Sequence, residues 1–471
     1  MRPLIASLGL SILIPALGSA QVTPVATSAK HPVLAIQDTE TKVQRDARMA
    51  WWREAKFGMF IHWGLYAVPA GIWKGTPVTP TEGAWIMNHG KIPVADYKAE
   101  ASQFNPTKFD ADAWVAEAKA AGMKYIIFTA KHHDGFAMFK SDANPFNIVD
   151  ATPFKRDPLK ELVAACQKQG IKLGFYYSQD QDWTEPGGTA IHGHWDKAQD
   201  GDFATYQKTK VIPQLKELLA NYQPAPAVIW FDTPSHAMNW GLASQIVTLL
   251  NQHPNLIWDN RLGAGYSGDM DTPEQVIPPQ APPGRDFEAC TTINGTWGYR
   301  SKPSAIKTKE TLLRDLIDIA SKGGNFLLNV GPDATGVIPQ PEVDRLKEIG
   351  QWLDVNGEAI YGTGPSAFNE IHGSYSATLL NGRGKPAFIP KWDWRCTTKP
   401  GEIYIHLLTW PGTSFQLADV KGTVTKAYLL ADPKRASRPI VQKGSDLTVT
   451  LPAQAPDPIA SVLALDVTDG K

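Results

Sequence analysis

Cysteine is scarce in this chain, which has only Cys166, Cys290 and Cys396 among 471 residues. An odd number of widely spaced cysteines excludes a disulfide framework and a cysteine-rich metal site. Neither charge sign is in excess, because 46 basic residues face 47 acidic ones. The composition therefore gives no electrostatic reason to expect binding to nucleic acid or to an anionic membrane surface.

Long apolar runs are also scarce. The clearest one, at residues 8–17, follows Arg2 and precedes the small residues Gly18, Ser19 and Ala20, a pattern typical of a secretory signal peptide. It is too short to persist as a membrane span. We therefore expect residues 1–20 to be a signal peptide, residues 21–44 to be a polar leader, and the mature protein to be exported to the periplasm or the medium without membrane insertion.

Residues 45–362 lack a glycine-rich dinucleotide fingerprint but show alternating strand and helix patterns. Together with the polar strand ends, this alternation predicts an α/β fold of the (β/α)₈ TIM-barrel type as the catalytic domain. Helices are expected at 112–121, 158–169, 203–221, 243–251, 309–321 and 341–355, and strands at 57–63, 125–131, 173–178, 227–232, 256–260 and 325–330. Residues 363–471 instead show short alternating runs between Gly, Pro and Asp turns, which predict an antiparallel β-sandwich.

The run at residues 227–233 (AVIWFDT) is the most informative strand, because it is apolar and ends in the single carboxylate Asp232. Barrel enzymes carry their chemistry at the C-terminal ends of strands. Glu274 lies about forty residues further on in a turn-rich segment, and Pro273, Val276, Ile277 and Pro278 would give it apolar surroundings that keep it protonated. Two such acids suit glycoside hydrolysis, with one as nucleophile and the other as proton donor. Glu288 is a rival for the second role, and Asp259, Asp269 and Asp271 are weaker candidates.

Three histidines, His62, His132 and His133, follow two early strands, so a zinc site must be weighed. In strand geometry His132 and His133 would face opposite ways, and the His-x-His spacing of many barrel metal sites is missing. No metal is therefore expected, and neutral imidazoles that bind sugar hydroxyls fit better. Trp230 shares a strand face with Asp232, and Arg261 would favour the ionised form of a neighbouring carboxylate. Asn325, Asn329 and Asp333 look like turn and barrel-end residues without a catalytic role.

Several motifs, taken in order, resemble the α-L-fucosidases of glycoside hydrolase family 29. They are residues 51–64 (WWREAKFGMFIHWG), 129–136 (TAKHHDGF), 175–178 (FYYS), 230–232 (WFD), 260–261 (NR), 272–274 (TPE), 296–299 (TWGY) and 327–332 (LLNVGP). The resemblance implies a barrel followed by a β-sandwich, a retaining exo-hydrolase without a cofactor, and a fucosylated oligosaccharide or glycoconjugate as substrate.

The resemblance also implies roles for individual residues. Asp232 would be the nucleophile and Glu274 the acid/base, with Glu288 as the alternative. The substrate-binding residues implied are His62, Trp85, His132, His133, Tyr177, Trp230, Arg261 and Trp297.

One position departs from the family pattern. Many relatives read Gly-Glu-Trp-Ile where this chain has Gly83-Ala84-Trp85-Ile86, so a usual sugar-binding carboxylate is missing. Glu82, two residues earlier, is a candidate substitute. The loss keeps open an alternative function, a catalytically impaired fucose-binding protein on the same fold.

Overall fold

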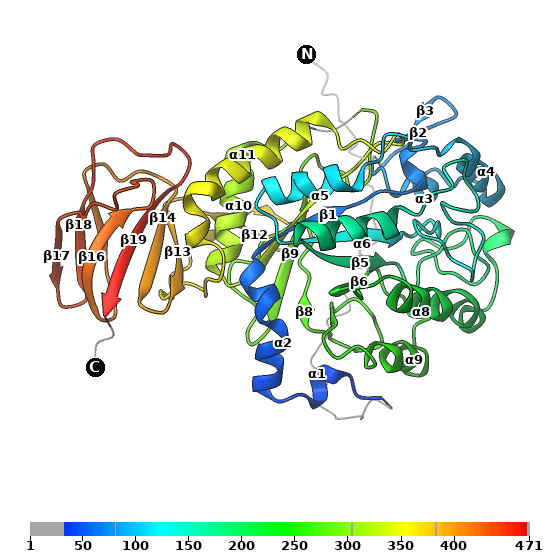
Figure 1. Ribbon diagram of the computed structural model, residues 1–471, viewed down its shortest axis with the longest axis horizontal. Coiled ribbons are helices and arrows are strands. Elements are labelled where there is room, and N and C mark those ends of the chain that lie inside the picture. Colours follow the sequence, from blue (N-terminus) through cyan, green and yellow to red (C-terminus); the bar gives the residue numbers. More distant parts are fainter. Residues whose placement is uncertain (1–32, 81, 303–304, 382–383, 469–471) are drawn as a thin grey trace, which may run out of the picture.

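The computed structural model describes residues 33–80, 82–302, 305–381 and 384–468, which form a barrel followed by a smaller β domain (Figure 1). The expected signal peptide at residues 1–20 lies outside the described residues, as does the leader up to residue 32.

Eight parallel strands form the barrel predicted from the sequence. Their order in the sheet is β7-β6-β5-β4-β1-β10-β9-β8. A bridge between Asp259 and Met270 brings β8 beside β7, so the sheet curls round on itself. The strands are β1 (Phe57–Ile61), β4 (Tyr125–Lys131), β5 (Lys172–Tyr177), β6 (Val228–Phe231), β7 (Ile257–Trp258), β8 (Met270–Asp271), β9 (Asp286–Thr292) and β10 (Asn325–Val330).

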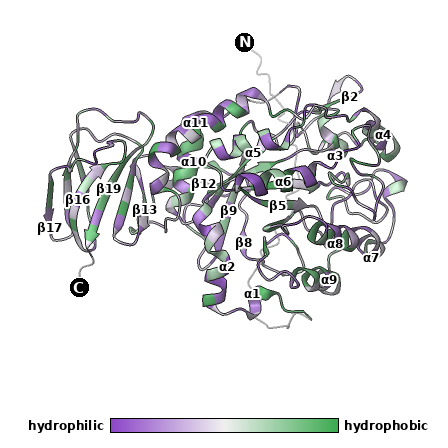
Figure 2. Ribbon diagram, viewed as in Figure 1, coloured by the Kyte–Doolittle hydropathy of each residue, from purple (hydrophilic) through white to green (hydrophobic). Residues whose placement is uncertain are grey.

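Helices cover the outside of the barrel, and all six predicted helices are present. Hydrophobic and hydrophilic residues alternate along α11 in Figure 2, as expected for a helix with one face on a core. Within the described residues, no helix combines the length and apolarity that crossing a membrane requires. The helices after β1 are α3 (Ile86–His89), α4 (Val94–Ala99), α5 (Ala111–Ala120), α6 (Pro158–Gln169), α7 (Phe203–Tyr206), α8 (Ile212–Ala220), α9 (Trp240–Leu250), α10 (Lys309–Ser321) and α11 (Gln340–Asn356).

Shorter elements complete the barrel domain. The predicted helix at 203–221 consists of α7, a π-helical turn η4 (Gln207–Val211) and α8. The assigned elements include no helix between β7 and β8 or between β8 and β9, so the barrel departs from a regular (β/α)₈ repeat there. The remaining short elements are η1 (Leu65–Ala67), η2 (Glu100–Gln103), η3 (Lys197–Gln199), η5 (Gly357–Ala359), β2 (Ile72–Trp73) and β3 (Thr76–Pro77).

Large side chains fill the barrel interior. Phe60, Tyr125 and Trp230 belong to one buried cluster, together with Trp52 from the preceding helix α2 (Lys42–Ala55). Gly58 has to be glycine, because a Cβ atom there would lie only 2.4 Å from the Tyr125 ring. The barrel is therefore a packed core, and its usable space lies at the ends of the strands.

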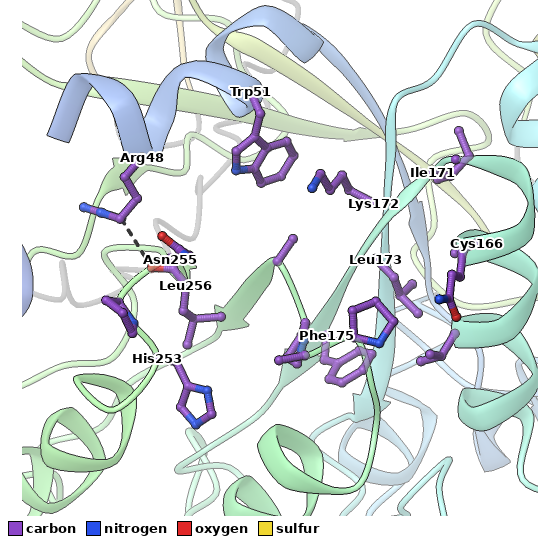
Figure 3. A pocket seen from close by; sticks show the side chains of 18 of the residues that line it. Arg48, Trp51, Cys166, Ile171, Lys172, Leu173, Phe175, His253, Asn255 and Leu256 are labelled. Atoms are coloured by element: carbon purple, nitrogen blue, oxygen red, sulfur yellow. Dashed lines mark hydrogen bonds between the residues drawn. The ribbon is translucent and has the colours of Figure 1, made fainter. Parts of the chain in front are cut away.

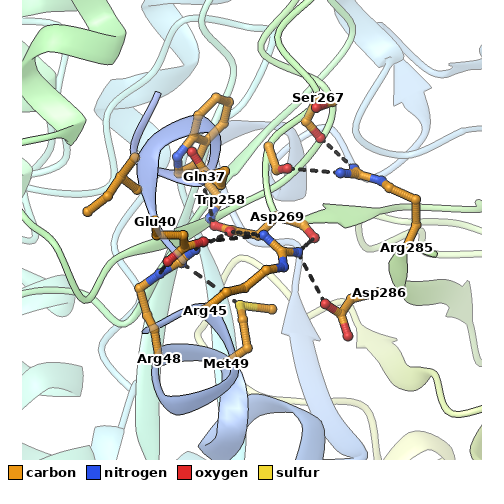
Figure 4. Close-up of polar contacts among 12 residues, drawn as sticks. Gln37, Glu40, Arg45, Arg48, Met49, Trp258, Ser267, Asp269, Arg285 and Asp286 are labelled. Atoms are coloured by element: carbon orange, nitrogen blue, oxygen red, sulfur yellow. Dashed lines mark hydrogen bonds and ion pairs between the residues drawn. The ribbon is translucent and has the colours of Figure 1, made fainter. Parts of the chain in front are cut away.

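The fold begins earlier than the sequence predicts. Helix α1 (Ile36–Thr39) and α2 lie against the barrel, although residues up to 44 were expected to precede the fold. Figure 4 shows the reason: Asp269 accepts hydrogen bonds from Gln37 at 2.8 Å, Arg45 at 3.2 Å and Arg48 at 2.6 Å. These long-range contacts give the polar segment a partner that its own pattern does not reveal.

The C-terminal domain contains the antiparallel sheets expected of a β-sandwich. A sheet of order β13-β14-β19-β16 and a sheet of order β15-β18-β17 share one apolar core, which includes Ile405, Leu465, Phe415 and Val449. A separate hairpin, β11-β12, precedes them. The strands are β11 (Gly373–Leu380), β12 (Pro386–Pro390), β13 (Trp394–Lys399), β14 (Glu402–Leu407), β15 (Ser414–Leu417), β16 (Thr423–Leu429), β17 (Ile440–Lys443), β18 (Asp446–Thr450) and β19 (Ser461–Thr468).

Candidate functional site

A small cavity of about 190 Å³ lies at the C-terminal ends of the barrel strands. A cavity of about 150 Å³ holds a benzene-sized ring, so this space suits a single sugar ring. Its described lining residues are Phe60, His62, Trp85, His132, Tyr176, Ile191, Trp230, Asp232, Thr233, Arg261, Glu274, Cys290 and Trp297.

A larger cavity, of about 730 Å³, lies at the opposite end of the barrel (Figure 3). It is lined by Lys172 and Leu173 at the start of β5, by Leu256 just before β7, and by Trp51 of α2. Its described lining contains no carboxylate. The chemistry of a parallel barrel belongs to the other end, so we assign the candidate active site to the smaller cavity.

Asp232 is held by donors on both carboxylate oxygens. Its Oδ2 accepts from the Tyr176 hydroxyl at 2.8 Å, and its Oδ1 accepts from Arg261 Nη1 at 2.8 Å and from the Thr233 amide at 2.8 Å. His133 Nε2 lies 3.4 Å from Oδ2. Burial alone would raise the pKa of Asp232, but Arg261 and His133 outweigh it and hold that pKa well below its usual range. Asp232 is therefore an ionised carboxylate facing the cavity.

Glu274 and Asp232 contact the same cation, Arg261. Arg261 Nη1 lies 2.8 Å from Glu274 Oε2 and 2.8 Å from Asp232 Oδ1, so those two oxygens are at most 5.6 Å apart. Retaining glycosidases place their two carboxyl groups about 5–5.5 Å apart, whereas inverting ones leave about 6.5–9.5 Å for a water. The bound for these two oxygens is close to the retaining separation and below the inverting range.

The surroundings expected for Glu274 are not those found. The side chain is 41% exposed and lies beside Arg261, and Val276 is 57% exposed. The neighbouring apolar residues therefore do not bury the carboxyl. Its position comes instead from the backbone, because Gln275 N donates to Cys290 O at 2.9 Å and Cys290 N donates to Pro273 O at 3.0 Å. These bonds extend the β8–β9 pairing up to the cavity.

His62 and His132 line the cavity and are both buried. Burial lowers the pKa of His62 to about 3 and that of His132 well below its ordinary value, so both rings are neutral near pH 7. His62 Nδ1 lies 2.6 Å from Asn329 Oδ1. His132 Nδ1 is buried without a hydrogen-bond partner among the described residues. Neutral rings of this kind suit hydrogen bonds to hydroxyl groups, as predicted.

His133 contacts Asp232, and it does not face away from His132 as strand geometry predicted. Strand β4 ends at Lys131, so strand alternation no longer separates the two histidines, and their ring centres lie 4.2 Å apart. Ser178 Oγ donates to Gln181 O at 2.9 Å, and it therefore accepts from His133 Nδ1 at 2.7 Å. This bond turns His133 Nε2 toward Asp232.

The prediction that Tyr177 contacts the sugar is wrong. Its hydroxyl donates to Gln214 Oε1 at 2.9 Å, it is buried, and it is not part of the cavity lining. Successive side chains on a strand point to opposite faces, so Tyr176 points into the barrel and Tyr177 points out. Tyr176 is the residue that lines the cavity and holds Asp232.

Three tryptophans predicted to bind substrate, Trp85, Trp230 and Trp297, all line the cavity. The suggestion that Glu82 replaces the carboxylate missing at Ala84 is wrong, because its carboxylate points elsewhere. It accepts from Trp297 N at 3.0 Å and from the Thr296 hydroxyl at 3.1 Å. Glu82 therefore holds the loop that carries Trp297.

The rival acids lie away from the cavity. Glu288 is fully buried inside the barrel, where it accepts from Trp230 Nε1 at 3.0 Å and from the Tyr125 hydroxyl, and burial raises its pKa to about 7. Asp259 is buried and accepts a hydrogen bond from the Phe231 amide at 3.1 Å. Asp269 forms ion pairs with the arginines of α2, and Asp271 pairs with Arg285 at 2.9 Å. None of these four lines the cavity.

No group of three or more His, Cys, Asp or Glu side chains in the described part of the chain is placed to hold a metal ion. Sequence reasoning missed several residues around the cavity, namely Phe60, Tyr176, Gln179, Ile191, Thr233, Cys290 and Asn329. Tyr176 pairs in register with Trp230, and the sequence alone does not reveal that pairing. Ile191 belongs to a loop that gives no periodic signal.

The comparisons with known proteins agree with this geometry. A sequence model described as Alpha-L-fucosidase matches residues 25–358. The human plasma alpha-L-fucosidase is 33% identical over 397 residues, which cover 79% of each chain. The bovine tissue alpha-L-fucosidase is 30% identical over 430 residues, 86% of this chain and 85% of that one.

Solved structures extend the similarity to the whole fold. Alpha-L-fucosidase isoenzyme 1 from Paenibacillus thiaminolyticus superposes with a TM-score of 0.78 at 36% identity, over 90% of this chain and all of that chain. A GH29 alpha-L-fucosidase from Bacteroides thetaiotaomicron, trapped as a covalent intermediate with 2-fluoro-fucosyl fluoride, gives a TM-score of 0.77 at 29% identity, over 90% of this chain and 96% of that one. The chain belongs to the α-L-fucosidases of glycoside hydrolase family 29, which are retaining enzymes.

Proposed function

We propose that this protein is an exported exo-α-L-fucosidase that uses Asp232 as its nucleophile and Glu274 as its acid/base. The observation that carries the proposal is the shared contact of both carboxylates with Arg261 Nη1. It brings them within the distance of a retaining pair at the mouth of a cavity sized for one sugar. A cavity for one ring supports removal of a terminal residue.

In the first step, an Asp232 oxygen attacks the anomeric carbon of the fucosyl group while the bond to the leaving oxygen breaks. Glu274 in its protonated form gives its proton to that leaving oxygen. Asp232 becomes a neutral ester, while Glu274 becomes a carboxylate as it gives up its proton. The charge of Arg261 then acts mainly on Glu274 and stabilises the carboxylate that this step leaves behind.

In the second step, a water molecule attacks the anomeric carbon from the side vacated by the leaving group. Glu274 now accepts a proton from that water, and the ester bond to Asp232 breaks. Two inversions at the same carbon return the original α configuration. Glu274 is suited to this exchange because it is 41% exposed, so water and leaving group both reach it.

The remaining predicted residues surround the sugar. Neutral His62 and His132 would bind its hydroxyl groups, and His133 would complete the ring of polar contacts beside Asp232. Trp85, Trp230 and Trp297 would pack against its C–H and methyl groups, because aromatic faces offer apolar surface. The pattern at residues 1–20 supports export.

The test is an NMR time course of the hydrolysis of an aryl α-L-fucoside by the full-length mature protein. We expect α-fucose to appear first and β-fucose to follow only through mutarotation. Initial release of β-fucose would contradict the retaining assignment. Saturable binding of fucose without any release of the aryl group would instead identify the alternative, an impaired fucose-binding protein.

A further inference from the structure

Asn329, near the end of β10, lies between two parts of the candidate site. Its Oδ1 is 2.6 Å from His62 Nδ1, and its Nδ2 donates to the backbone carbonyl of Trp297 at 2.8 Å. The side chain is 2% exposed, so water does not compete for these bonds. Asn329 does not line the cavity itself. It contacts one residue that faces the sugar hydroxyls and one that forms an aromatic wall.

The Trp297 carbonyl fixes the direction of both bonds. A carbonyl oxygen only accepts hydrogen bonds, so the Asn329 NH₂ group must face it and the amide oxygen must face His62. That amide oxygen also only accepts, so His62 Nδ1 must carry a hydrogen. Burial favours the neutral ring, in which the other nitrogen then has no hydrogen.

His62 Nε2 has no hydrogen-bond partner among the described residues, and the ring lines the cavity. We infer that Asn329 is a positioning residue that makes His62 a hydrogen-bond acceptor toward the substrate. A sugar hydroxyl that contacts His62 must therefore donate its hydrogen to Nε2. The inference rests on the proposed function only for the identity of that hydroxyl, because the hydrogen positions of His62 can be measured without turnover.

The neighbouring His133 is oriented in the same way. Its Nδ1 is held by a neutral acceptor, Ser178 Oγ, at 2.7 Å, while its Nε2 lies 3.4 Å from the Asp232 carboxylate. Asn329 is likewise a neutral acceptor at Nδ1, so it orients the His62 ring without placing a charge beside that nitrogen. A carboxylate in the place of Asn329 would instead favour the doubly protonated His62 ring, in which both nitrogens donate. The titratable groups near His62 are His133, Asp232 and His132, and the ring centre of His132 lies 5.5 Å from that of His62.

The first test is the ¹⁵N NMR signature of His62 in the full-length mature protein at pH 7, assigned by comparison with a His62→Gln variant. We expect a protonated Nδ1 and an unprotonated Nε2. In Asn329→Asp, which keeps the shape of the side chain but supplies a carboxylate, we expect both nitrogens to be protonated. A wild-type signal with hydrogen on Nε2 would overturn the inference, whether or not the protein turns over fucosides.

The second test is kinetic. In Asn329→Asp, Nε2 becomes a donor and the contact with the donating sugar hydroxyl is lost, so kcat/KM for an aryl α-L-fucoside should fall about 10- to 100-fold, mainly through KM. Asn325→Asp is the matched control, because Asn325 is a buried asparagine of the same strand whose Nδ2 donates to Trp52 O at 2.8 Å. It should leave the His62 signal unchanged. An unchanged His62 signal and KM in folded Asn329→Asp would overturn the positioning role.

Discussion

Replacing Arg261 with glutamine removes a cation that contacts both Asp232 and Glu274. Each contact is 2.8 Å long, and Arg261 is 19% exposed while Asp232 is 14% exposed. At an effective dielectric constant of about 20, two charges at that distance attract by about 6 kcal/mol before the cost of desolvation. Removing one partner of such a hydrogen-bonded pair costs about 2–5 kcal/mol. The contact to Glu274 counts for less, because that side chain is 41% exposed.

The expected consequence is a change in pH dependence. The nucleophile must be ionised, and burial opposes its ionisation while Arg261 and His133 favour it. Without Arg261 the pKa of Asp232 rises, so the acid limb of the kcat/KM profile moves to higher pH. At pH values below the wild-type limb, a loss of about 2–5 kcal/mol corresponds to the full, roughly 30- to 5,000-fold lower kcat/KM, and the deficit shrinks between the two limbs.

The assay is a pH series of initial rates with an aryl α-L-fucoside, with thermal unfolding to verify that the variant is folded. Arg285→Gln is the matched control, because Arg285 makes a comparable 2.9 Å pair with Asp271 outside the cavity. It should leave the acid limb in place. A folded Arg261→Gln variant with the wild-type acid limb would refute the electrostatic role assigned to Arg261.

Three further predictions test other parts of the structure. Tyr176→Phe removes a donor to Asp232 and should lower kcat about 10-fold or more, whereas Tyr177→Phe should change kcat less than about 3-fold. Equal effects in steady-state assays would contradict the finding that Tyr176, and not Tyr177, faces the cavity. Glu288→Gln should keep kcat/KM within about 10-fold of wild type, since Glu288 lies outside the cavity. Because its folded pKa of about 7 exceeds its ordinary 4.5, ionisation costs stability as pH rises between those values, and urea unfolding should show that this variant loses less stability there; an identical slope would reject the argument. Asp269→Ala leaves the buried Arg48 with Glu40 as its remaining carboxylate partner and removes the acceptor of Gln37 and Arg45, so it should cost about 3–5 kcal/mol in urea unfolding, against about 1 kcal/mol or less for the more exposed Asp271→Ala; similar costs would rule out a special role for the Asp269 network.

Local sequence signals predicted much of the fold. Helix α6 spans the predicted residues 158–169, because Asp157 caps its first turn and Gly170, with φ of 76°, ends it. Strands β8 and β9 were missed. The first has two residues, and the second, with the sequence DFEACTT, mixes polar and apolar residues without a clear period. Their strand geometry depends on pairing with each other and with β10.

The candidate site was predicted less completely than the fold. Asp232, Trp230 and Arg261 were found because they end apolar strands. Tyr176 was mistaken for Tyr177, because an apolar run of four residues does not reveal which face points inward. Asn329 was dismissed, since its role depends on His62 and on a carbonyl of the Trp297 loop, both far away in the sequence. Hydrogen-bond partners from distant elements leave no local pattern.

The most direct test of the assigned mechanism is to identify the residue that carries the covalent intermediate. Treating the protein with 2-fluoro-fucosyl fluoride should trap a fucosyl ester, which peptide mass spectrometry can locate. We predict one 2-fluoro-fucosyl group, attached to Asp232, and no label in Asp232→Asn. A label on any other residue, or turnover without a trapped ester, would contradict the account.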